Sequence, residues 1–333
     1  MSRWNKLSGI ASLRVHLHEL TLQLIKTFIV SKIYPASSII MLRPKNFGYN
    51  PLTADSNSFQ QKVKVEYSAV AYEFEQLVEK IRAVGIDVLV LEDSLDPPKP
   101  DAIFLNNWIS THEDGSVFIY PLEAVNRRIE RRAELIEQLY SSFIFSSFND
   151  LSATEKEGKF IEGTGSMVLD HNHRHVFAAI SGRTDQDLVQ AWAKNMQYDC
   201  TCFHAFDEFG KAIYHTNVMM SVGDDYALAC MSTILNPMER KAIIAYFKKA
   251  KKTLIDISYH QMNSFAGNCI QLKNKDHQKF IVISSSAYAS LNADQIEKLT
   301  TESDLIIGHI PTIEKVGGGS VRCMIAENFL EKR

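Results

Sequence analysis

The sequence predicts an α/β fold in which five similar ββαβ units close into a ring. Four segments of the 333-residue chain follow one plan: an apolar strand with a polar tip, a turn, a second strand, a helix and a closing strand. The polar residues at matching points of this repeat are separated by 55, 53, 53 and 55 positions, and they are Asn107, Glu162, His215, Asn268 and Cys323. Regular repetition of a small sheet is typical of a propeller.

The fifth unit is expected to be split between the two ends of the chain. The four complete segments begin at Asp101, Phe160, Ala212 and Ser264. A glycine-rich loop near the C-terminus starts the fifth unit, and its helix and remaining strands come from residues 39–91. Closing a ring with both chain ends in one unit leaves no open sheet edge. In this pseudo-fivefold ring the side chains expected to point towards one axis are Asn107, Glu162, His215 and Cys323.

Helices are predicted on the outside of the ring and strands inside it. Apolar residues at helical spacing mark a helix over residues 68–84 that ends at Gly85. Further helices are expected over 185–195 with Thr184 as N-cap, from Asn236-Pro237 to Lys251, and over 293–299 after Asn292. The strands at 87–91 and 279–283 are almost continuously apolar, so both of their faces should be covered.

Residues 1–36 are expected to be an extension in front of a single domain over residues 37–333. The stretch 20–30 is apolar, but charged residues interrupt it and no run of 18 apolar residues exists, so we expect no membrane-spanning helix. An amphipathic helix suits this stretch better than a signal peptide, which needs an uninterrupted apolar segment. A translation start upstream of the natural one is an open alternative, and we assign the extension no role.

Charge and cysteine content exclude several classes of protein. A net charge of −3 and a pI near 6.4 give no electrostatic reason to expect nucleic acid or an anionic membrane as a partner. Five irregularly spaced cysteines favour a reduced, cytoplasmic protein over a secreted disulfide framework. The hydrophobic content of 45% is enough for a large core.

Three clusters that contain histidine or cysteine are expected to be structural. The histidines at 171, 173 and 175 should lie in the hairpin between two strands of their unit. Cys200 and Cys202 lack a second pair of zinc ligands. Cys230 lies on an apolar strand without a glycine loop and should pack in the core. We therefore expect no bound metal and no cofactor.

One cysteine has the surroundings of a nucleophile. Cys323 ends the stretch that begins with Gly317-Gly318-Gly319, and glycine lets the backbone approach a ligand closely. A thiol in this position is either a packing residue or a nucleophile held over a pocket. Because Glu162 and His215 stand at the same point of other repeat units, we favour the nucleophile.

Five motifs in this chain resemble, in the same order, the landmarks of the guanidino-group-modifying, or pentein, superfamily. They are FLNNW (104–108), EGTGSMVLD (162–170), SGRT (181–184), YHTN (214–217) and GGGSVRC (317–323). Members of the superfamily include arginine deiminase, dimethylarginine hydrolase and the amidinotransferases. The run RPKNFGYNPLTADSNSFQ (43–60) resembles more particularly the citrulline utilization hydrolases, or citrulline ureidases. The resemblance covers about residues 38–330 and implies the pentein α/β propeller.

The resemblance implies hydrolysis of a small amino-acid substrate through a cysteine. Cys323 is then the nucleophile that attacks the central carbon of a guanidinium-like group, and His215 is the general acid and base. Glu162 accepts from a substrate nitrogen and orients His215. Arg183 matches the arginine that holds the substrate α-carboxylate, and a second such arginine falls at either Arg127 or Arg128.

Two asparagines depart from the deiminase pattern. Deiminases have aspartate at the positions of Asn107 and Asn217, where the carboxylates neutralise a substrate cation. A ureido group is neutral and its carbonyl oxygen needs a donor, which an asparagine amide supplies and an aspartate does not. The departure favours citrulline over arginine as substrate, with ornithine, ammonia and carbon dioxide as products.

Two other functions stay open at this point. The first is a guanidinium-modifying enzyme of the arginine deiminase, dimethylarginine hydrolase or amidinotransferase type, which consumption of arginine with release of citrulline would favour. A pentein that binds a macromolecule without catalysis would not need Cys323, His215 and Glu162 together. The sequence does not fix the chain length of the substrate or the order in which the amines leave. It also leaves the oligomeric state open, and a homo-oligomer is one possibility.

Overall fold

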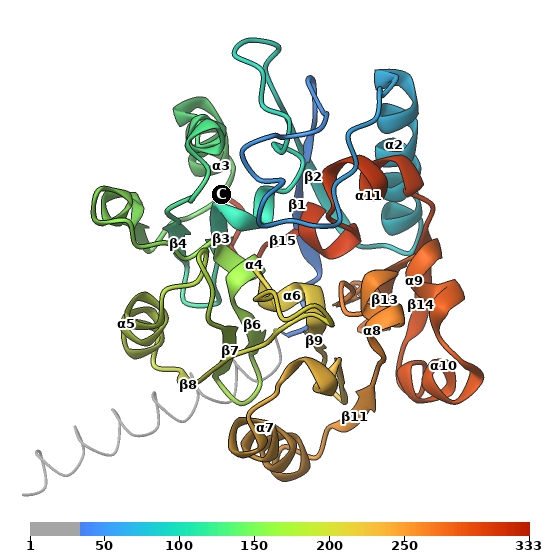
Figure 1. Cartoon of the computed structure of the whole chain (residues 1–333). Coiled ribbons are helices and arrows are strands. Elements are labelled where there is room, and N and C mark those ends of the chain that lie inside the picture. The colour runs from blue at the N-terminus through green and yellow to red at the C-terminus, as the bar shows by residue number, and fades with distance from the viewer. Residues whose placement is uncertain (1–33) are drawn as a thin grey trace, which may run out of the picture. The chain divides into compact units, whose positions relative to one another are not determined.

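The computed structural model describes residues 34–333, of which Pro35–Arg333 form one compact unit. This unit contains five three-stranded sheets arranged around a centre, as Figure 1 shows. The predicted ring of five units is confirmed. Most of the predicted extension over residues 1–36, including the helix expected over 20–30, lies outside the described residues.

Each sheet combines one antiparallel and one parallel pair of strands. In spatial order the sheets are β15 (Ala326–Glu327), β1 (Ser38–Arg43) and β2 (Asp87–Glu92); β3 (Ile109–Thr111), β4 (Ser116–Ile119) and β5 (Ser147–Asp150); β6 (Val168–Asp170), β7 (His175–Ala179) and β8 (Asp199–Phe203); β9 (Met220–Val222), β10 (Tyr226–Ala229) and β11 (Thr253–Asp256); and β12 (Ile270–Lys273), β13 (Lys279–Ser284) and β14 (Asp304–Gly308). The first sheet joins the C-terminal strand β15 to β1 and β2, so the fifth unit is split as predicted.

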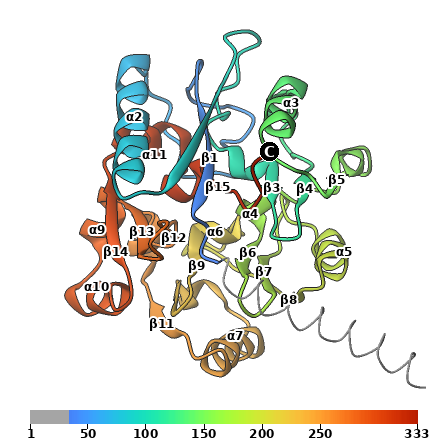
Figure 2. The same cartoon turned by 180° about the vertical axis from the view of Figure 1, so that it is seen from behind.

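A helical crossover connects the two parallel strands of each sheet and lies at the periphery of the ring, which is also clear from behind in Figure 2. These outer helices are α2 (Tyr67–Ala83), α3 (Ala133–Ser142), α5 (Gln186–Met196), α7 (Pro237–Lys249), α9 (Ser285–Ser290) and α10 (Ala293–Leu299). The connection from β2 to β3, which leads from one sheet to the next, contains no outer α-helix. Residues 96–100 there join two successive units of the ring.

Two local predictions are wrong. The N-cap of α5 is Asp185 rather than Thr184, because the Asp185 carboxylate accepts the Leu188 N–H at 3.0 Å while the Thr184 hydroxyl donates to Ser166. Strand β2 is half-buried rather than covered on both faces, since it is an outer strand of its sheet. Strand β13, at the centre of its sheet, is buried as predicted.

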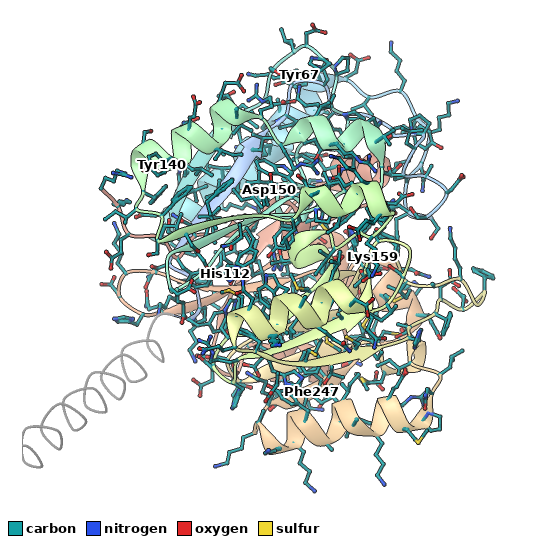
Figure 3. The ribbon with its side chains drawn as sticks, turned by 90° about the vertical axis from the view of Figure 1, so that its left-hand side faces the viewer. Tyr67, His112, Tyr140, Asp150, Lys159 and Phe247 are labelled. Atoms are coloured by element: carbon teal, nitrogen blue, oxygen red, sulfur yellow. The ribbon has the colours of Figure 1, made fainter. Side chains whose placement is uncertain are left out.

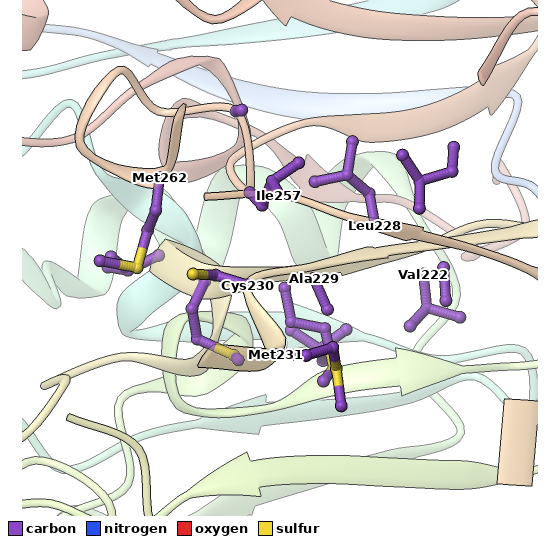
Figure 4. Close-up of a cluster of buried hydrophobic side chains, with 14 of the residues drawn as sticks. Val222, Leu228, Ala229, Cys230, Met231, Ile257 and Met262 are labelled. Atoms are coloured by element: carbon purple, nitrogen blue, oxygen red, sulfur yellow. The ribbon is translucent and has the colours of Figure 1, made fainter. Parts of the chain in front are cut away.

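The core lies between the sheets and the outer helices. Phe247 on α7, labelled in the side view of Figure 3, is one of its fully buried side chains. Figure 4 shows part of the largest apolar cluster, in which Cys230 packs beside Met231, Met262 and Ile257. The predicted core role of Cys230 is confirmed. Among residues 34–333 no helix is both long and apolar enough to cross a membrane.

Short helical turns, rather than strand ends, line the centre of the ring. They are η1 (Leu105–Asn107), α4 (Gly163–Ser166), α6 (Thr216–Met219) and η5 (Val321–Met324). Two further helices, α8 (Tyr259–Asn263) and α11 (Pro311–Gly317), precede the segments that carry Asn268 and Cys323. Gly163 has a φ of +49°, and a Cβ there would lie 2.2 Å from the Asn106 carbonyl oxygen. Glycine therefore lets α4 approach η1 closely enough to bring the polar residues of two units together.

Candidate active site

A cavity of about 20 Å³ lies at the centre of the ring beside Cys323. Five of the eight predicted site residues line it, and they are Asn107, Arg127, Arg183, His215 and Cys323. Two more contact this group from behind: Glu162 binds His215, and Asn217 lies at the Cys323 sulfur. The structure thus gathers seven of the eight residues and leaves out Arg128.

The buried carboxylate of Glu162 connects several units of the ring. Its Oε2 accepts from His215 Nε2 at 2.8 Å and lies 3.6 Å from Arg183 Nη1 and 4.0 Å from Arg127 Nη1. Its Oε1 accepts the backbone N–H of Glu123 at 2.9 Å. Burial alone would raise the pKa of Glu162, but Arg183 and the His215 hydrogen bond hold this pKa at about 2. Glu162 is therefore ionised, and it fixes the orientation of the imidazole.

Burial and the contact with Glu162 together determine the protonation of His215. Burial lowers the pKa of His215, and the hydrogen bond that His215 donates to Glu162 only partly opposes that effect. A neutral imidazole at physiological pH can accept a proton, as a general base must.

Cys323 is carried by η5 and is 8% exposed. Its backbone N–H donates to the Ser320 carbonyl at 3.0 Å, and its sulfur lies 3.2 Å from Asn268 Nδ2 and 3.6 Å from Asn217 Nδ2. Burial raises the pKa of the thiol, and the Asn268 amide partly opposes this by stabilising the thiolate. The sulfur therefore sits among neutral amide donors.

Asn268 is a site residue that the sequence interpretation did not select. It occupies the matching point of the fourth repeat unit, 55 positions before Cys323, so the repeat itself carried the signal. Asparagine is common in turns, so its residue type alone gives no functional signal. Only its position in the repeat could have identified Asn268 as a site residue.

The two neighbouring arginines of η2 (Val125–Glu130) face different ways. Arg127 is buried, forms a two-pronged pair with Glu130 at 2.9 and 3.0 Å, and donates to Asn107 Oδ1 at 2.8 Å. Arg128 instead donates to the Leu122 carbonyl at 3.0 Å and pairs with Glu155. Of the two residues expected as alternatives, Arg127 is the one placed at the cavity.

Asp101 is a second site residue that was not selected. It is buried and lines the cavity, and its Oδ2 accepts from Asn50 at 2.7 Å and from Thr53 at 3.2 Å. Its Oδ1 is buried without a hydrogen-bond partner among the described residues. A buried carboxylate oxygen with no partner is costly, so this atom is suited to receive a donor from a ligand.

Residues 50–61, here called the covering segment, close the cavity from one side. Asn57 donates to the Gly317 and Gly318 carbonyls at 3.3 and 3.2 Å, and thereby holds the glycine loop in front of Cys323. Arg183 donates to the Thr53 carbonyl at 3.2 Å and to the Ser56 hydroxyl. Its Nε has no hydrogen-bond partner among the described residues. These long-range contacts link the covering segment to both the nucleophile loop and Arg183.

The site offers no obvious place for a metal ion. Within residues 34–333, no group of three or more His, Cys, Asp or Glu side chains is arranged to hold one. The polar groups of the cavity are already engaged mainly with each other.

The raised pKa of the Cys323 thiol predicts how its alkylation depends on pH. The thiolate fraction is small at neutral pH and grows as the pH rises through the raised pKa, so alkylation by iodoacetamide should still be accelerating above pH 9. The rate should be followed by peptide mass spectrometry between pH 6 and 10, with Cys323→Ser as control. If the alkylation rate instead stops rising below pH 8, the thiol pKa is not raised, and His215 takes the thiol proton in the free protein.

Comparison with known proteins agrees with the fold. The family model for N,N dimethylarginine dimethylhydrolase, eukaryotic, matches residues 43–330. No curated protein matches the chain. The solved N-terminal domain of ArgZ, an arginine dihydrolase from the ornithine-ammonia cycle in cyanobacteria, superposes with a TM-score of 0.68 at 15% identity, over 86% of this chain and 96% of that one. The chain spans 40% of the ArgZ chain in the apo structure.

Two further structures of similar fold contain a covalently bound ligand. An asparagine-to-serine variant of the ArgZ domain is covalently bound to a reaction intermediate, with a TM-score of 0.68 at 16% identity over 87% of this chain and 96% of that one. A dimethylarginine dimethylaminohydrolase variant that forms an adduct with S-methyl-L-thiocitrulline has a TM-score of 0.62 at 15% identity, over 88% of this chain and all of that one. The family match over residues 43–330 shows that the chain belongs to the N,N dimethylarginine dimethylhydrolase family.

Proposed function

We propose that this enzyme hydrolyses the ureido group of a citrulline-like amino acid by covalent catalysis through Cys323. The observation that carries the proposal is the neutral surroundings of the sulfur. Its hydrogen-bonding neighbours among the described residues are the amides of Asn217 and Asn268, and both of their NH₂ groups point at it. Amide donors suit a carbonyl oxygen that becomes negative during attack.

The charges of the site also favour a neutral reacting group. Glu162 is matched by Arg183 and by its hydrogen bond to His215, and Glu130 is matched by Arg127. A guanidinium placed near the sulfur would find these carboxylates already compensated, and a buried cation without a counter-charge is costly. A ureido group brings no such charge.

Asp101 and Arg183, which line the cavity, suit the α-ammonium and α-carboxylate groups of an amino acid. The Oδ1 of Asp101, which has no hydrogen-bond partner among the described residues, is suited to an α-ammonium group. The Nε of Arg183 makes no hydrogen bond there, lies 4.0 Å from Glu123 Oε2 and is suited to an α-carboxylate. Both residues also contact the covering segment, so binding there would hold the segment in place.

The proposed reaction proceeds in two steps. The Cys323 sulfur, whose proton is taken up by His215, attacks the ureido carbon, and the tetrahedral adduct collapses as His215 protonates the departing amine. Water then attacks the resulting S-carbamoyl-type adduct, the C–S bond breaks, and the carbamate formed releases carbon dioxide. The sum is citrulline plus water giving ornithine, ammonia and carbon dioxide.

A second candidate is hydrolysis of a guanidino group, and the family match favours it. The matched family is named for dimethylarginine, and the ArgZ neighbours are arginine dihydrolases. Hydrolysing the same guanidino carbon twice passes through a ureido group, so the two chemistries share their second step. A panel of citrulline, arginine, agmatine and dimethylarginine, with ammonia and ornithine as readouts, separates the candidates.

Asn107 and Asn217 should set the preference between citrulline and arginine within this panel. Wild-type enzyme should have the higher kcat/KM for citrulline, because arginine leaves a donor facing a donor and adds a buried charge. Asn107→Asp combined with Asn217→Asp should lower the ratio of kcat/KM for citrulline over arginine by about tenfold or more, since a difference of 1.4 kcal/mol is already tenfold. Steady-state kinetics on both substrates measures it.

The matched control is Asn149→Asp, which makes the same change on the exposed strand β5 and should leave the ratio unchanged. A wild-type preference for arginine, or a ratio that the double substitution does not move, would contradict the ureidase proposal and favour the guanidino hydrolase.

Gly165 should tolerate no side chain. A Cβ there would lie 2.6 Å from Asn107 Nδ2 and 2.8 Å from His215 Nδ1, so Gly165→Ala must displace the imidazole. A shift of about 1 Å in a catalytic group can cost on the order of 100-fold in rate. We expect kcat for the preferred substrate to fall by about that factor, while Gly182→Ala, where nothing lies within 4 Å, keeps its rate. Equal rates for the two variants would argue against the placement of His215.

A further inference from the structure

A larger cavity of about 480 Å³ lies on the other side of the covering segment. It is lined by Phe59 of the covering segment, by the 207–211 turn, by residues around α8 and by Glu314 and Lys315 of α11. Tyr214 lines both cavities, and its hydroxyl donates to the Gly318 carbonyl at 3.2 Å. The two cavities are therefore neighbours, separated by the covering segment, Tyr214 and the glycine loop.

Aromatic rings form one part of this larger cavity. Phe59 and Phe265 lie with ring centroids 5.3 Å apart, and Phe209 at the tip of the 207–211 turn is 87% exposed. Phe265 has a φ of +65°, a left-handed conformation that is strained for a bulky side chain and that tends to occur at ligand sites. Aromatic faces of this kind pack against alkyl chains and attract cations.

Glu314 supplies a buried acidic side chain at the same cavity. Its side chain accepts from Ser320 at 2.6 Å and from Ser286, and it is 5% exposed. No ion pair joins it to a cation among the described residues, and burial raises the pKa of its carboxyl. A buried carboxylate stabilised by hydroxyls alone gains from a cationic ligand, which compensates its charge.

Lys315 supplies the opposite charge beside it. This residue is exposed, and neither an ion pair nor a hydrogen bond from its ammonium occurs within residues 34–333. Asp207 and Glu208 lie on the turn across the cavity. The cavity is also lined by Lys211, whose ammonium donates to the Asp55 carbonyl. It therefore combines three acidic residues, aromatic walls and the Lys315 ammonium, which bonds to no group within residues 34–333, and this set suits an amino acid with a cationic side chain.

We propose that this cavity is a second binding site for a basic amino acid such as ornithine or arginine. The ligand's side-chain cation lies at Glu314 between the aromatic rings, and its α-carboxylate pairs with Lys315. The site borders the nucleophile loop directly, because Ser320 donates to Glu314 and its carbonyl accepts the Cys323 N–H. The Gln61 N–H also donates to the Lys315 carbonyl at 2.9 Å, which ties the covering segment to the same wall.

Equilibrium binding of L-ornithine tests the proposal. The titration uses Cys323→Ser protein, which cannot turn over substrate, so its result is independent of which reaction the enzyme catalyses. We expect a binding event that Lys315→Glu removes, that Phe209→Ala weakens several-fold, and that Asp101→Asn in the first cavity leaves in place. Because Lys315 and Phe209 are exposed, neither change should disturb folding, which circular dichroism checks.

Lys241→Glu, which makes the same charge reversal on helix α7, is the matched control and should retain the binding event. If ornithine binds with the same affinity and stoichiometry in the Lys315→Glu and Phe209→Ala proteins, or does not bind at all, the second site is overturned. A binding event that disappears only in Asp101→Asn would place the ligand in the first cavity and would also overturn it.

Discussion

The fully buried carboxylate of Glu162 is the constraint on which the active centre depends. It carries a charge in the middle of the ring, and that charge is stable only because groups from several units converge on it: His215, Arg183, Arg127 and the backbone of Glu123. The convergence fixes the imidazole, and through Arg183 it reaches the covering segment. Removing one partner would leave an uncompensated charge at the centre, which a packed interior does not tolerate.

The ring geometry explains why residues so distant in sequence form one site. Each unit contributes one polar residue from a short turn at its inner end, while its strands and outer helix supply apolar packing. The centre can therefore be polar and specific without weakening the core around it. Under the proposed function, the neutral amides at the sulfur face the reacting group, and the paired charges farther out face the α-ammonium and α-carboxylate of the substrate.

The periodic part of this arrangement could be predicted from the sequence. The repeat of 53 to 55 positions placed four units and the split fifth unit, and it placed Glu162, His215 and Cys323 at equivalent points. Asn268 obeyed the same rule and was still passed over. Contacts made by loops outside the repeat could not be predicted from the sequence. Residue spacing indicates neither the unpartnered oxygen of Asp101 nor the hydrogen bonds from Asn57 to the glycine loop. The facing of Arg127 and Arg128 depended on the geometry of one turn.

The central claim is that Cys323 attacks a ureido carbon held by neutral amides. Rapid acid quenching during turnover of citrulline, followed by intact-protein and peptide mass spectrometry, tests it most directly. We expect a thiocarbamate adduct on the peptide that contains Cys323, which appears with citrulline and decays as substrate is consumed. An unmodified Cys323 peptide with citrulline, together with an amidine-type adduct formed from arginine, would contradict it.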